Sequence, residues 1–229
     1  MLTQTTARGV SSKHITPHVR PVPPVGSHAL DGNMELLGAP MAFTRNAEIY
    51  GEGEPADYVY KVISGSVRTY KVLSDGRRQI GAFYMVGDVF GLETGDEHAF
   101  SAEAISDAKV LVIKRSALVA LAERDNEVAR QLWTLTGREL SRVQDHILLL
   151  IKTAQERVVG FLLEMAERAS NNGALELPMS RQDIADYLGL TIETVSRTLT
   201  ILENTAAIEL PTSRRIVLRN RSALNRLNA

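Results

Sequence analysis

Apolar residues change their spacing along the chain, and the first pattern is one of short alternating runs. Between about Met41 and Lys114 these runs are rich in β-branched and aromatic residues and are separated by turns such as Ser64-Gly65-Ser66. Short alternating runs with glycine turns between them predict a small antiparallel β-barrel or β-roll. The runs are Tyr58–Ile63, Val67–Val72, Gln79–Met85 and Lys109–Ile113.

From about Glu127 to Lys152 the spacing of apolar residues becomes helical. They recur every three or four positions, which predicts a long helix with one apolar stripe. Such a stripe most often marks a helix face that is buried in its own domain. Its members are Leu132, Leu135, Leu140, Val143, Ile147 and Leu150. A further amphipathic helix is expected beyond a joint near residues 151–154, ending at Asn171-Asn172-Gly173.

The stretch Leu177–Asn204 predicts two short helices with a tight joint. Ser180 is a good N-cap, and Asp183 suits the first turn of the first helix. Gly189 fits the left-handed position that closes a helix, and Thr191 can cap the second helix. This arrangement is typical of a helix-turn-helix, although an ordinary helical hairpin has the same pattern.

The second of these helices has two faces of different chemistry. Glu193, Ser196 and Arg197 share the outer face near its N-terminus, the part that helix-turn-helix proteins lay in the DNA major groove. Arginine can bond to guanine, glutamate accepts from the cytosine amino group, and serine bonds to several base edges. We therefore expect these three residues to read bases, unless they are a solvated ion pair on a helix surface. The opposite face, expected to point into a core, is Ile192, Val195, Leu199 and Leu202.

The chain after Asn204 predicts a β-hairpin, with Ala207–Leu210 and Arg215–Leu218 as its strands, which makes a winged helix. From Pro211 to the end there are five arginines and no acidic residue, a local basic patch in a chain of net charge −1. Hydroxyls, helix N-termini and arginines are the groups that contact phosphates. The candidates for phosphate contact are Ser180, Arg181, Thr191, Thr194, Arg214 and Arg215.

Composition excludes several classes of protein. The chain has no cysteine, so disulfides, thiolate catalysis, zinc fingers and cysteine-ligated clusters are excluded. The chain lacks a G-x-S-x-G elbow and a phosphate loop, and its five histidines are scattered, so we expect no enzyme. His14 and His18 have a metal-binding spacing, but four nearby prolines argue against the helix that it requires. No apolar run approaches membrane-spanning length and no secretory signal is visible, so we expect a cytoplasmic protein without a membrane partner.

The patterns together predict four segments. Residues 1–35 are expected to be a flexible N-terminal arm, because prolines and polar residues dominate them. Residues 36–125 are expected to form a β-roll sensor-like domain and residues 126–152 a long helix. Residues 153–229 are expected to form a winged helix-turn-helix DNA-binding domain.

Three motifs resemble the Crp/Fnr family of bacterial transcription regulators. Gly51-x-Gly53 and the later Gly87-Asp88-Val89-Phe90-Gly91 look like its cyclic-nucleotide-binding-type β-roll, and Glu193-x-x-Ser196-Arg197 is similar to the Fnr-like recognition helix. Without cysteines the chain looks like the FixK group. The resemblance implies an α+β fold in which the long helix is the homodimer coiled coil. It also implies a transcription activator with duplex DNA and RNA polymerase as partners and a TTGAT-N4-ATCAA-like palindrome as its target.

The chain departs from the nucleotide-binding members of that family. They hold the cyclic phosphate with an Arg-Ser pair, whereas this chain has Asp96-Glu97-His98-Ala99-Phe100-Ser101, with two acids and no arginine. Carboxylates oppose phosphate binding, so we expect no bound cyclic nucleotide. Because the chain has no cysteine, we also expect no iron–sulfur cluster, and therefore no cofactor. His98 is expected to be an exposed loop residue. The alternatives are a ligand-gated Crp-like regulator with an unidentified small-molecule or haem effector, and a module that binds a protein.

Overall fold

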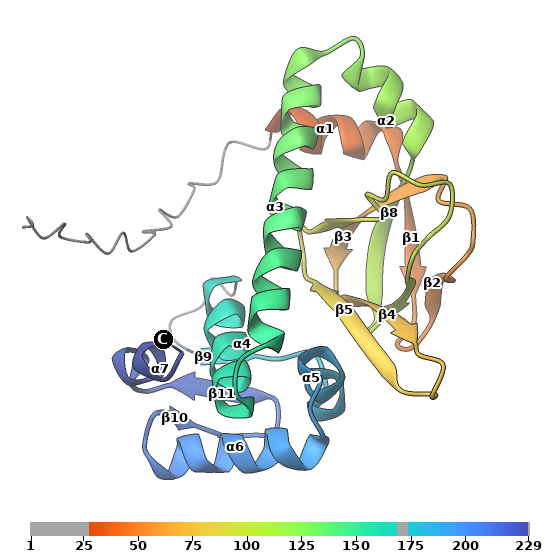
Figure 1. Cartoon of the computed structure of the whole chain (residues 1–229). Helices are drawn as coiled ribbons and strands as arrows, with labels where there is room; N and C mark the ends of the chain where they lie inside the picture. The colour runs from red at the N-terminus through yellow and green to blue at the C-terminus, as the bar shows by residue number, and fades with distance from the viewer. Residues whose placement is uncertain (1–27, 169–173, 229) are drawn as a thin grey trace, which may run out of the picture.

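The computed structural model describes residues 28–168 and 174–228 (Figure 1). It consists of an N-terminal β-roll, a long helix, and a C-terminal domain of short helices with a small sheet. This is the α+β architecture that the sequence predicts. Residues 1–27, with His14 and His18, lie outside the described residues. No helix among the described residues has the length and apolar character needed to cross a membrane.

The β-roll consists of two antiparallel four-stranded sheets that enclose a common core. Alternation along the strands places residues such as Val62, Val67 and Val110 inside. Gly65 turns between two strands at φ 77°, and a Cβ there would lie 2.3 Å from the Asp107 carbonyl oxygen, so the turn requires glycine. The sheets are β1-β8-β3-β6 and β2-β7-β4-β5. The strands are β1 Ala39–Phe43, β2 Glu48–Tyr50, β3 Tyr58–Ser64, β4 Val67–Val72, β5 Arg78–Tyr84, β6 Val89–Phe90, β7 Ser101–Ala104 and β8 Ala108–Lys114.

Two helices that the sequence analysis missed pack against this roll, α1 (His28–Leu37) and α2 (Arg115–Ala122). The expected flexible arm of residues 1–35 is therefore wrong from residue 28 onward. Leu30 and Met34 are buried, and the Leu30 backbone N–H donates to the Gln131 side-chain oxygen at 2.7 Å. These contacts stabilise α1 through residues distant in sequence, which local composition does not reveal.

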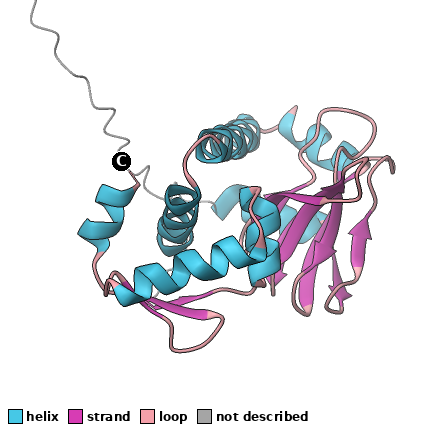
Figure 2. Ribbon diagram, turned by 60° about the horizontal axis from the view of Figure 1, so that its bottom comes forward, coloured by secondary structure: helices cyan, strands magenta, loops and turns pink. Residues whose placement is uncertain are grey.

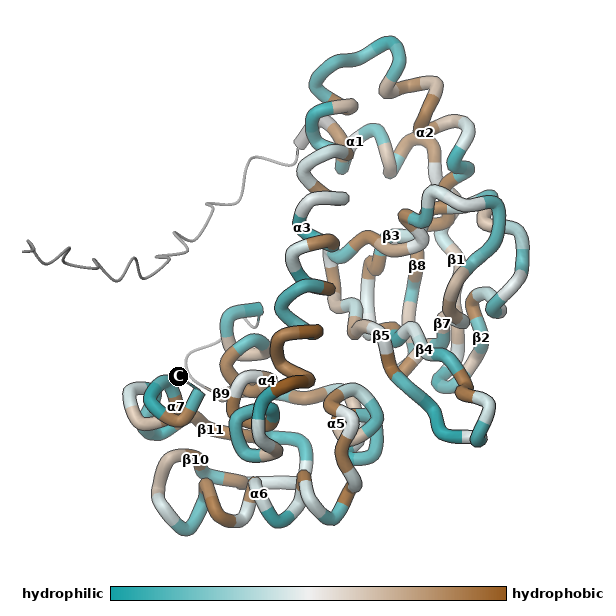
Figure 3. Tube along the Cα trace, viewed as in Figure 1, coloured by the Kyte–Doolittle hydropathy of each residue, from teal (hydrophilic) through white to brown (hydrophobic). Residues whose placement is uncertain are grey.

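The long helix α3 (Asn126–Leu150) connects the two domains. Asp125 caps it, because its carboxylate accepts from the backbone N–H groups of Glu127 and Val128. The helix ends at Leu150, and α4 starts at Ala154, so the predicted joint is where the chain turns. Figure 3 shows that the end of α3 nearest α4 is strongly hydrophobic.

The C-terminal domain is a winged helix-turn-helix. Its core is formed by apolar residues of α4, α6 and α7, among them Phe161, Leu199 and Leu224. The predicted hairpin is present, and a third strand, β9, extends it into a sheet of order β10-β11-β9. The elements are α4 Ala154–Arg168, β9 Ala174–Glu176, α5 Arg181–Leu188, α6 Ile192–Asn204, β10 Ile208–Glu209, β11 Arg215–Leu218 and α7 Arg221–Leu227.

The two domains share one hydrophobic cluster. Ile80 and Phe83 of β5 belong to the same buried cluster as the C-terminal core. The Phe83 ring lies 5.1 Å from the ring of Tyr187 in α5 and 6.2 Å from that of Phe161 in α4, centroid to centroid. The helix-turn-helix is therefore packed against the β-roll as well as attached to it by α3.

Candidate nucleic-acid interface

The helix-turn-helix is built as its caps predict. The Ser180 hydroxyl accepts from the Asp183 backbone N–H at 3.1 Å, and the Asp183 carboxylate accepts from the Ser180 backbone N–H at 2.9 Å. This reciprocal pair is a capping box that starts α5. Gly189 has φ 62° and ends α5 in the left-handed conformation, as predicted. Thr191 accepts from the Thr194 backbone N–H at 3.2 Å and starts α6.

Helix α6 lies on the outside of the C-terminal domain (Figure 2). Val195, Leu199 and Leu202 are buried in the domain core, as expected. Ile192 is exposed, so its predicted core position is wrong. It occupies the first turn of α6, which extends past the domain core, and it lines a cleft instead. The first turn of α6 therefore borders this cleft rather than the domain core.

The predicted base-reading residues lie on the outward side of α6. Glu193 and Arg197 are exposed, and Ser196 is half-buried. The pKa of the Glu193 carboxyl is lowered by a hydrogen bond from its own backbone N–H and by one from the Thr191 hydroxyl. Glu193 is therefore an ionised acceptor at neutral pH, the form that can accept from a cytosine amino group.

The hydroxyls among the candidate phosphate contacts are already engaged with each other or with the caps. Thr191 and Thr194 share a hydrogen bond, 3.1 Å between their hydroxyl oxygens at the start of α6. The Ser180 hydroxyl is held by Asp183 in the capping box. A hydroxyl in such a pair keeps further bonding capacity, because it has one donor and two acceptor sites.

The arginines among those candidates differ in their surroundings. Arg214 lies in the loop before β11 and Arg215 is the first residue of β11; both are exposed, whereas Arg181 is half-buried at the start of α5. Arg215 Nε lies 3.8 Å from a carboxylate oxygen of Glu176 in β9. Arg214 also borders a cleft of about 620 Å³ that runs between the wing and the β-roll.

A second cleft, of about 730 Å³, separates the first turn of α6 from the β4–β5 hairpin. Thr191, Glu193 and Thr194 form one wall, and Arg77 and Arg78 are part of the other. A molecule bound at the start of α6 would therefore also lie near the β-roll.

The stripe along α3 divides into two parts. Leu132 and Leu135 are partly buried against the chain's own core beside α1 and α2, so the structure gives them a core role that the predicted dimer interface did not include. Leu140, Val143 and Ile147 are exposed, and Leu150 is half-buried. The exposed part is turned around the helix relative to the core-facing part by roughly a quarter turn, because 3.6 residues complete a turn. The spacing of apolar residues in the sequence does not distinguish these two stripes, so the sequence analysis treated them as one.

The β-roll and α3 border an open cavity of about 540 Å³, and its α3 wall includes the exposed residues Leu140, Val143 and Ile147. Its lining, all from the described part of the chain, is largely apolar and includes the acids Glu93 and Glu139 but no lysine or arginine. Burial raises the pKa of the Tyr50 hydroxyl, which also lines it. The cavity therefore lacks the cationic side chains that hold phosphates.

His98 is buried, so the expectation of an exposed loop histidine is wrong. It is 2% exposed, and its ring stacks on Tyr50 with centroids 3.6 Å apart. Its Nδ1 lies 3.4 Å from a carboxylate oxygen of Glu93. The loop from β6 to β7 folds His98 back onto the roll, which its polar neighbours in sequence do not indicate.

Sequence reasoning also missed the side chains that surround α5. Arg68 and Arg78, from β4 and β5, both donate to the carboxylate of Asp183. The alternating pattern of these strands identifies them as strands but says nothing of what lies across from an arginine. The only sequence signal at the contact is Asp183 itself, which the capping pattern already explains.

Two family models match the chain, and they divide it as the structure does. The Crp-like helix-turn-helix domain matches residues 156–227, which contain α5, α6 and the wing. The cyclic nucleotide-binding domain matches residues 40–125, which contain the β-roll.

Individual relatives extend over both domains. The nitrogen fixation regulation protein FixK of Azorhizobium caulinodans is 55% identical over 199 residues, covering 84% of this chain and 80% of that protein. FixK of Rhizobium meliloti is 42% identical over 203 residues, covering 85% of this chain and 93% of that protein. The solved structure of FixK2 from Bradyrhizobium japonicum is similar with a TM-score of 0.81 and 54% identity, over 84% of this chain and 98% of that one.

Proposed function

The chain belongs to the FixK-like group of the Crp/Fnr family of transcription regulators, and we propose that it binds a TTGAT-N4-ATCAA-like palindrome as a homodimer and activates transcription there. The observation that carries this proposal is the division of α6 into two faces. Val195, Leu199 and Leu202 are buried, while Glu193 and Arg197 are exposed at the end of the helix that starts at the turn. An exposed glutamate and an exposed arginine at that end can bond to the edges of base pairs in a major groove.

Each predicted contact has a specific task in this proposal. Arg197 donates to a guanine, Glu193 accepts from a cytosine amino group, and Ser196 bonds to a neighbouring base edge. The backbone contacts set the register of the protein on the duplex and carry no sequence information themselves. They are assigned to Ser180, Arg181, Thr191, Thr194, Arg214 and Arg215.

The exposed part of α3 supports the homodimer. Leu140, Val143 and Ile147 are large apolar side chains on the surface of a single protomer, and pairing with the same stripe of a second copy would remove them from water. A two-fold dimer presents two copies of α6 to two half-sites whose centres lie about one helical turn apart, roughly 10 base pairs. The two halves of the palindrome then match the two protomers.

The cavity in the β-roll supports binding without cyclic nucleotide. Glu93 and Glu139 line it, and Asp96 and Glu97 lie in the loop that would surround the phosphate. A phosphate bound beside these carboxylates would lose its hydration without meeting a positively charged side chain, so its binding is unfavourable. The DNA-binding form is therefore available without this effector, and cellular control falls on the amount of the protein.

One observation favours the alternative of a gated regulator. Tyr50 Oη, Glu93 Oε2 and both ring nitrogens of His98 are buried without a hydrogen-bond partner in the protein. Buried polar atoms are usually paired, so a small ligand with hydrogen-bonding groups, or haem bound through His98, is the second candidate. A ligand of this kind would raise DNA affinity, whereas the first proposal predicts full affinity without it.

The test is a fluorescence-anisotropy titration of the purified chain with the labelled palindrome and with a scrambled duplex of equal composition. The proposal predicts tighter binding of the palindrome by about 10³-fold or more, unchanged by cyclic AMP or cyclic GMP. Equal affinity for the two duplexes would contradict it, and heparin competition separates DNA binding from capture of a protein partner. Transcription in vitro from a promoter with the palindrome tests activation and the RNA polymerase contact, with a promoter carrying the scrambled sequence as control.

A further inference from the structure

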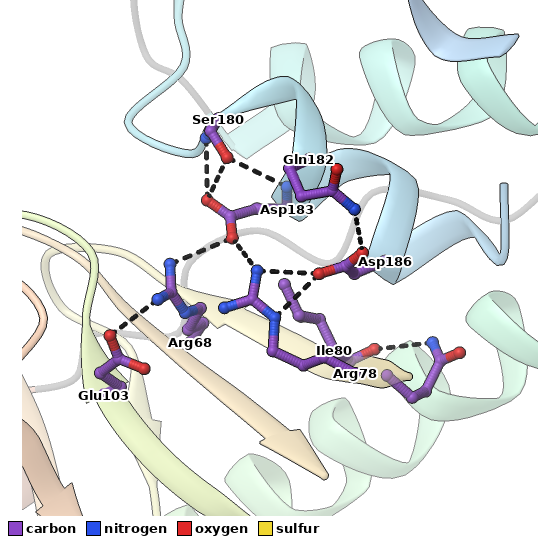
Figure 4. A network of polar contacts seen from close by, with 9 residues as sticks. Arg68, Arg78, Ile80, Glu103, Ser180, Gln182, Asp183 and Asp186 are labelled. Carbon is purple, nitrogen blue, oxygen red and sulfur yellow. Dashed lines mark hydrogen bonds and ion pairs between the residues drawn. The ribbon is translucent and has the colours of Figure 1, made fainter. Parts of the chain in front are cut away.

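The first helix of the helix-turn-helix begins against the β-roll, and one carboxylate joins the two. Asp183 is buried at the start of α5. Its Oδ2 accepts from the backbone N–H and the hydroxyl of Ser180, at 2.9 and 2.8 Å. Its Oδ1 accepts from Arg68 at 3.1 Å and from Arg78 at 2.6 Å (Figure 4). The group that caps α5 is therefore held by two arginines of the other domain.

Both arginines have a second acid to bond. Arg68 also donates to Glu103 of β7 at 2.7 Å, and Arg78 Nε donates to Asp186 of α5 at 2.8 Å. We call these five residues the interdomain clamp: Arg68, Arg78 and Glu103 of the β-roll, and Asp183 and Asp186 of α5. Figure 4 shows that they form one connected chain of contacts between the sheet and the helix. Each arginine bridges two carboxylates through different N–H groups of its planar guanidinium, so these charge-assisted contacts fix orientation as well as distance.

We propose that Arg68 and Arg78 are positioning residues for DNA reading: they act through Asp183 and Asp186 to hold α5, and with it α6, in the orientation that binds DNA without an effector. This rests on the proposed DNA-binding function. In a protein with several domain orientations, the measured affinity falls with the fraction of molecules in the competent one. Contacts that favour one orientation in the free protein therefore do the work of an activating ligand.

The apolar contacts between the domains make this a question of orientation rather than of folding. Phe83 packs against Tyr187 and Phe161, and no clamp residue takes part in these ring contacts. Apolar packing is not directional, whereas the clamp fixes where α5 begins relative to β4 and β5. Loss of the clamp should therefore leave the domains associated but let the C-terminal domain take other orientations.

Arg78 is the better residue to change, and its neighbour supplies a matched control. The Arg78 side chain is 26% exposed, so its removal lets water reach Asp186, whereas the Arg68 side chain is only 8% exposed and its removal would leave Glu103, itself only 13% exposed, without its arginine. Arg77 is 77% exposed and pairs with Asp75 within its own hairpin. Arg77→Gln and Arg78→Gln both remove one positive charge beside the same cleft. Both variants therefore lose the same general electrostatic attraction to DNA, and a difference between their DNA affinities reports the contacts of Arg78 alone.

The experiment measures orientation and affinity separately. The chain has no cysteine, so Glu97→Cys in the β-roll and Thr200→Cys in α6, both exposed, give one spin-label pair, with excess unlabelled chain to isolate single labelled protomers. In Arg78→Gln we expect a broadened distance distribution and a palindrome affinity lower by about tenfold, the loss when one molecule in ten stays competent. Arg77→Gln should keep the narrow distribution and lose less affinity than Arg78→Gln.

A second variant keeps the result decisive. Asp186→Asn removes the other partner of Arg78 and leaves the capping box intact, so it should reproduce the broadened distribution, and the double variant should add little to either single change. A narrow distribution in Arg78→Gln and Asp186→Asn would overturn the proposal, as would equal losses of affinity in Arg77→Gln and Arg78→Gln. If palindrome and scrambled duplex bind alike while the distribution still broadens, the DNA-reading proposal fails and the clamp itself remains.

Discussion

The imidazole of His146 in α3 lies face to face with the ring of Tyr187 in α5, with centroids 3.9 Å apart and an angle of 8° between the planes. The His146 Nε2 is 2.8 Å from the Tyr187 carbonyl oxygen. A residue of the long helix α3 is thus stacked on the first helix of the helix-turn-helix. The contact connects α3, which we propose as the dimer helix, to the helix-turn-helix domain.

This contact predicts a loss of stability in mild acid. Burial lowers the pKa of His146 below 6.5, and the hydrogen bond to the Tyr187 carbonyl opposes the shift only in part. The unfolded chain then binds the proton more readily than the folded chain, so stability is lost as the pH falls below about 6.5. Urea unfolding at about pH 5 and about pH 8 should show this loss.

The control is His146→Phe, which keeps a ring against Tyr187 but cannot titrate. Its unfolding free energy should fall less between the same two pH values than that of the unchanged chain. Glu164, whose pKa burial raises, titrates in the opposite sense in both chains and cancels in the comparison. Equal acid sensitivity of the two chains would show that His146 is not responsible.

The exposed stripe of α3 predicts a point change that separates the protomers. Ile147→Asp should produce a monomer of about 25.2 kDa with an intact fold, because the side chain is 57% exposed within the protomer. Leu148 has the same exposed fraction but faces toward α4, where it borders a cleft with Lys152 and Leu163. Sedimentation equilibrium should therefore find a dimer for Leu148→Asp, and a dimer for Ile147→Asp would place the interface elsewhere.

The wing predicts a change in salt dependence without a change in specificity. Arg214→Gln should weaken binding to palindrome and scrambled duplex alike and reduce the slope of log K against log salt by about 1. Arg219→Gln is the matched control, since Arg219 is another wing arginine but bonds to Glu209. If both changes alter the slope equally, the contact is general attraction to the basic patch rather than a bond from Arg214.

The features of the fold that the sequence predicts correctly are those determined by residues close together in the chain. The helix-turn-helix was predictable because Ser180, Gly189 and Thr191 each act on a backbone group within a few residues, and the structure has all three in those roles. The β-roll was predictable because alternation and glycine turns are also local signals. The base-reading and phosphate-contacting residues stay predictions, because their partner is another molecule.

The features that the sequence did not predict depend on contacts between residues far apart in the chain. Arg68 and Arg78 are 115 and 105 positions away from Asp183, and no periodicity connects them. Helix α1 is held by residues such as Gln131, 101 positions beyond Leu30. The exposure of His98 was predicted wrongly for the same reason, since this loop residue is buried against Tyr50 of β2.

The central claim is that α6 reads bases through Arg197, and the most direct measurement is the ratio of affinities for the palindrome and for a duplex changed at the guanine of each half-site. Arg197→Ala should cost about 1–3 kcal/mol per half-site on the palindrome and reduce this ratio toward one. Thr200→Ala, an exposed change one turn further along α6, should leave the ratio as it is. An unchanged ratio in Arg197→Ala would contradict the base-reading role and the regulatory mechanism built on it.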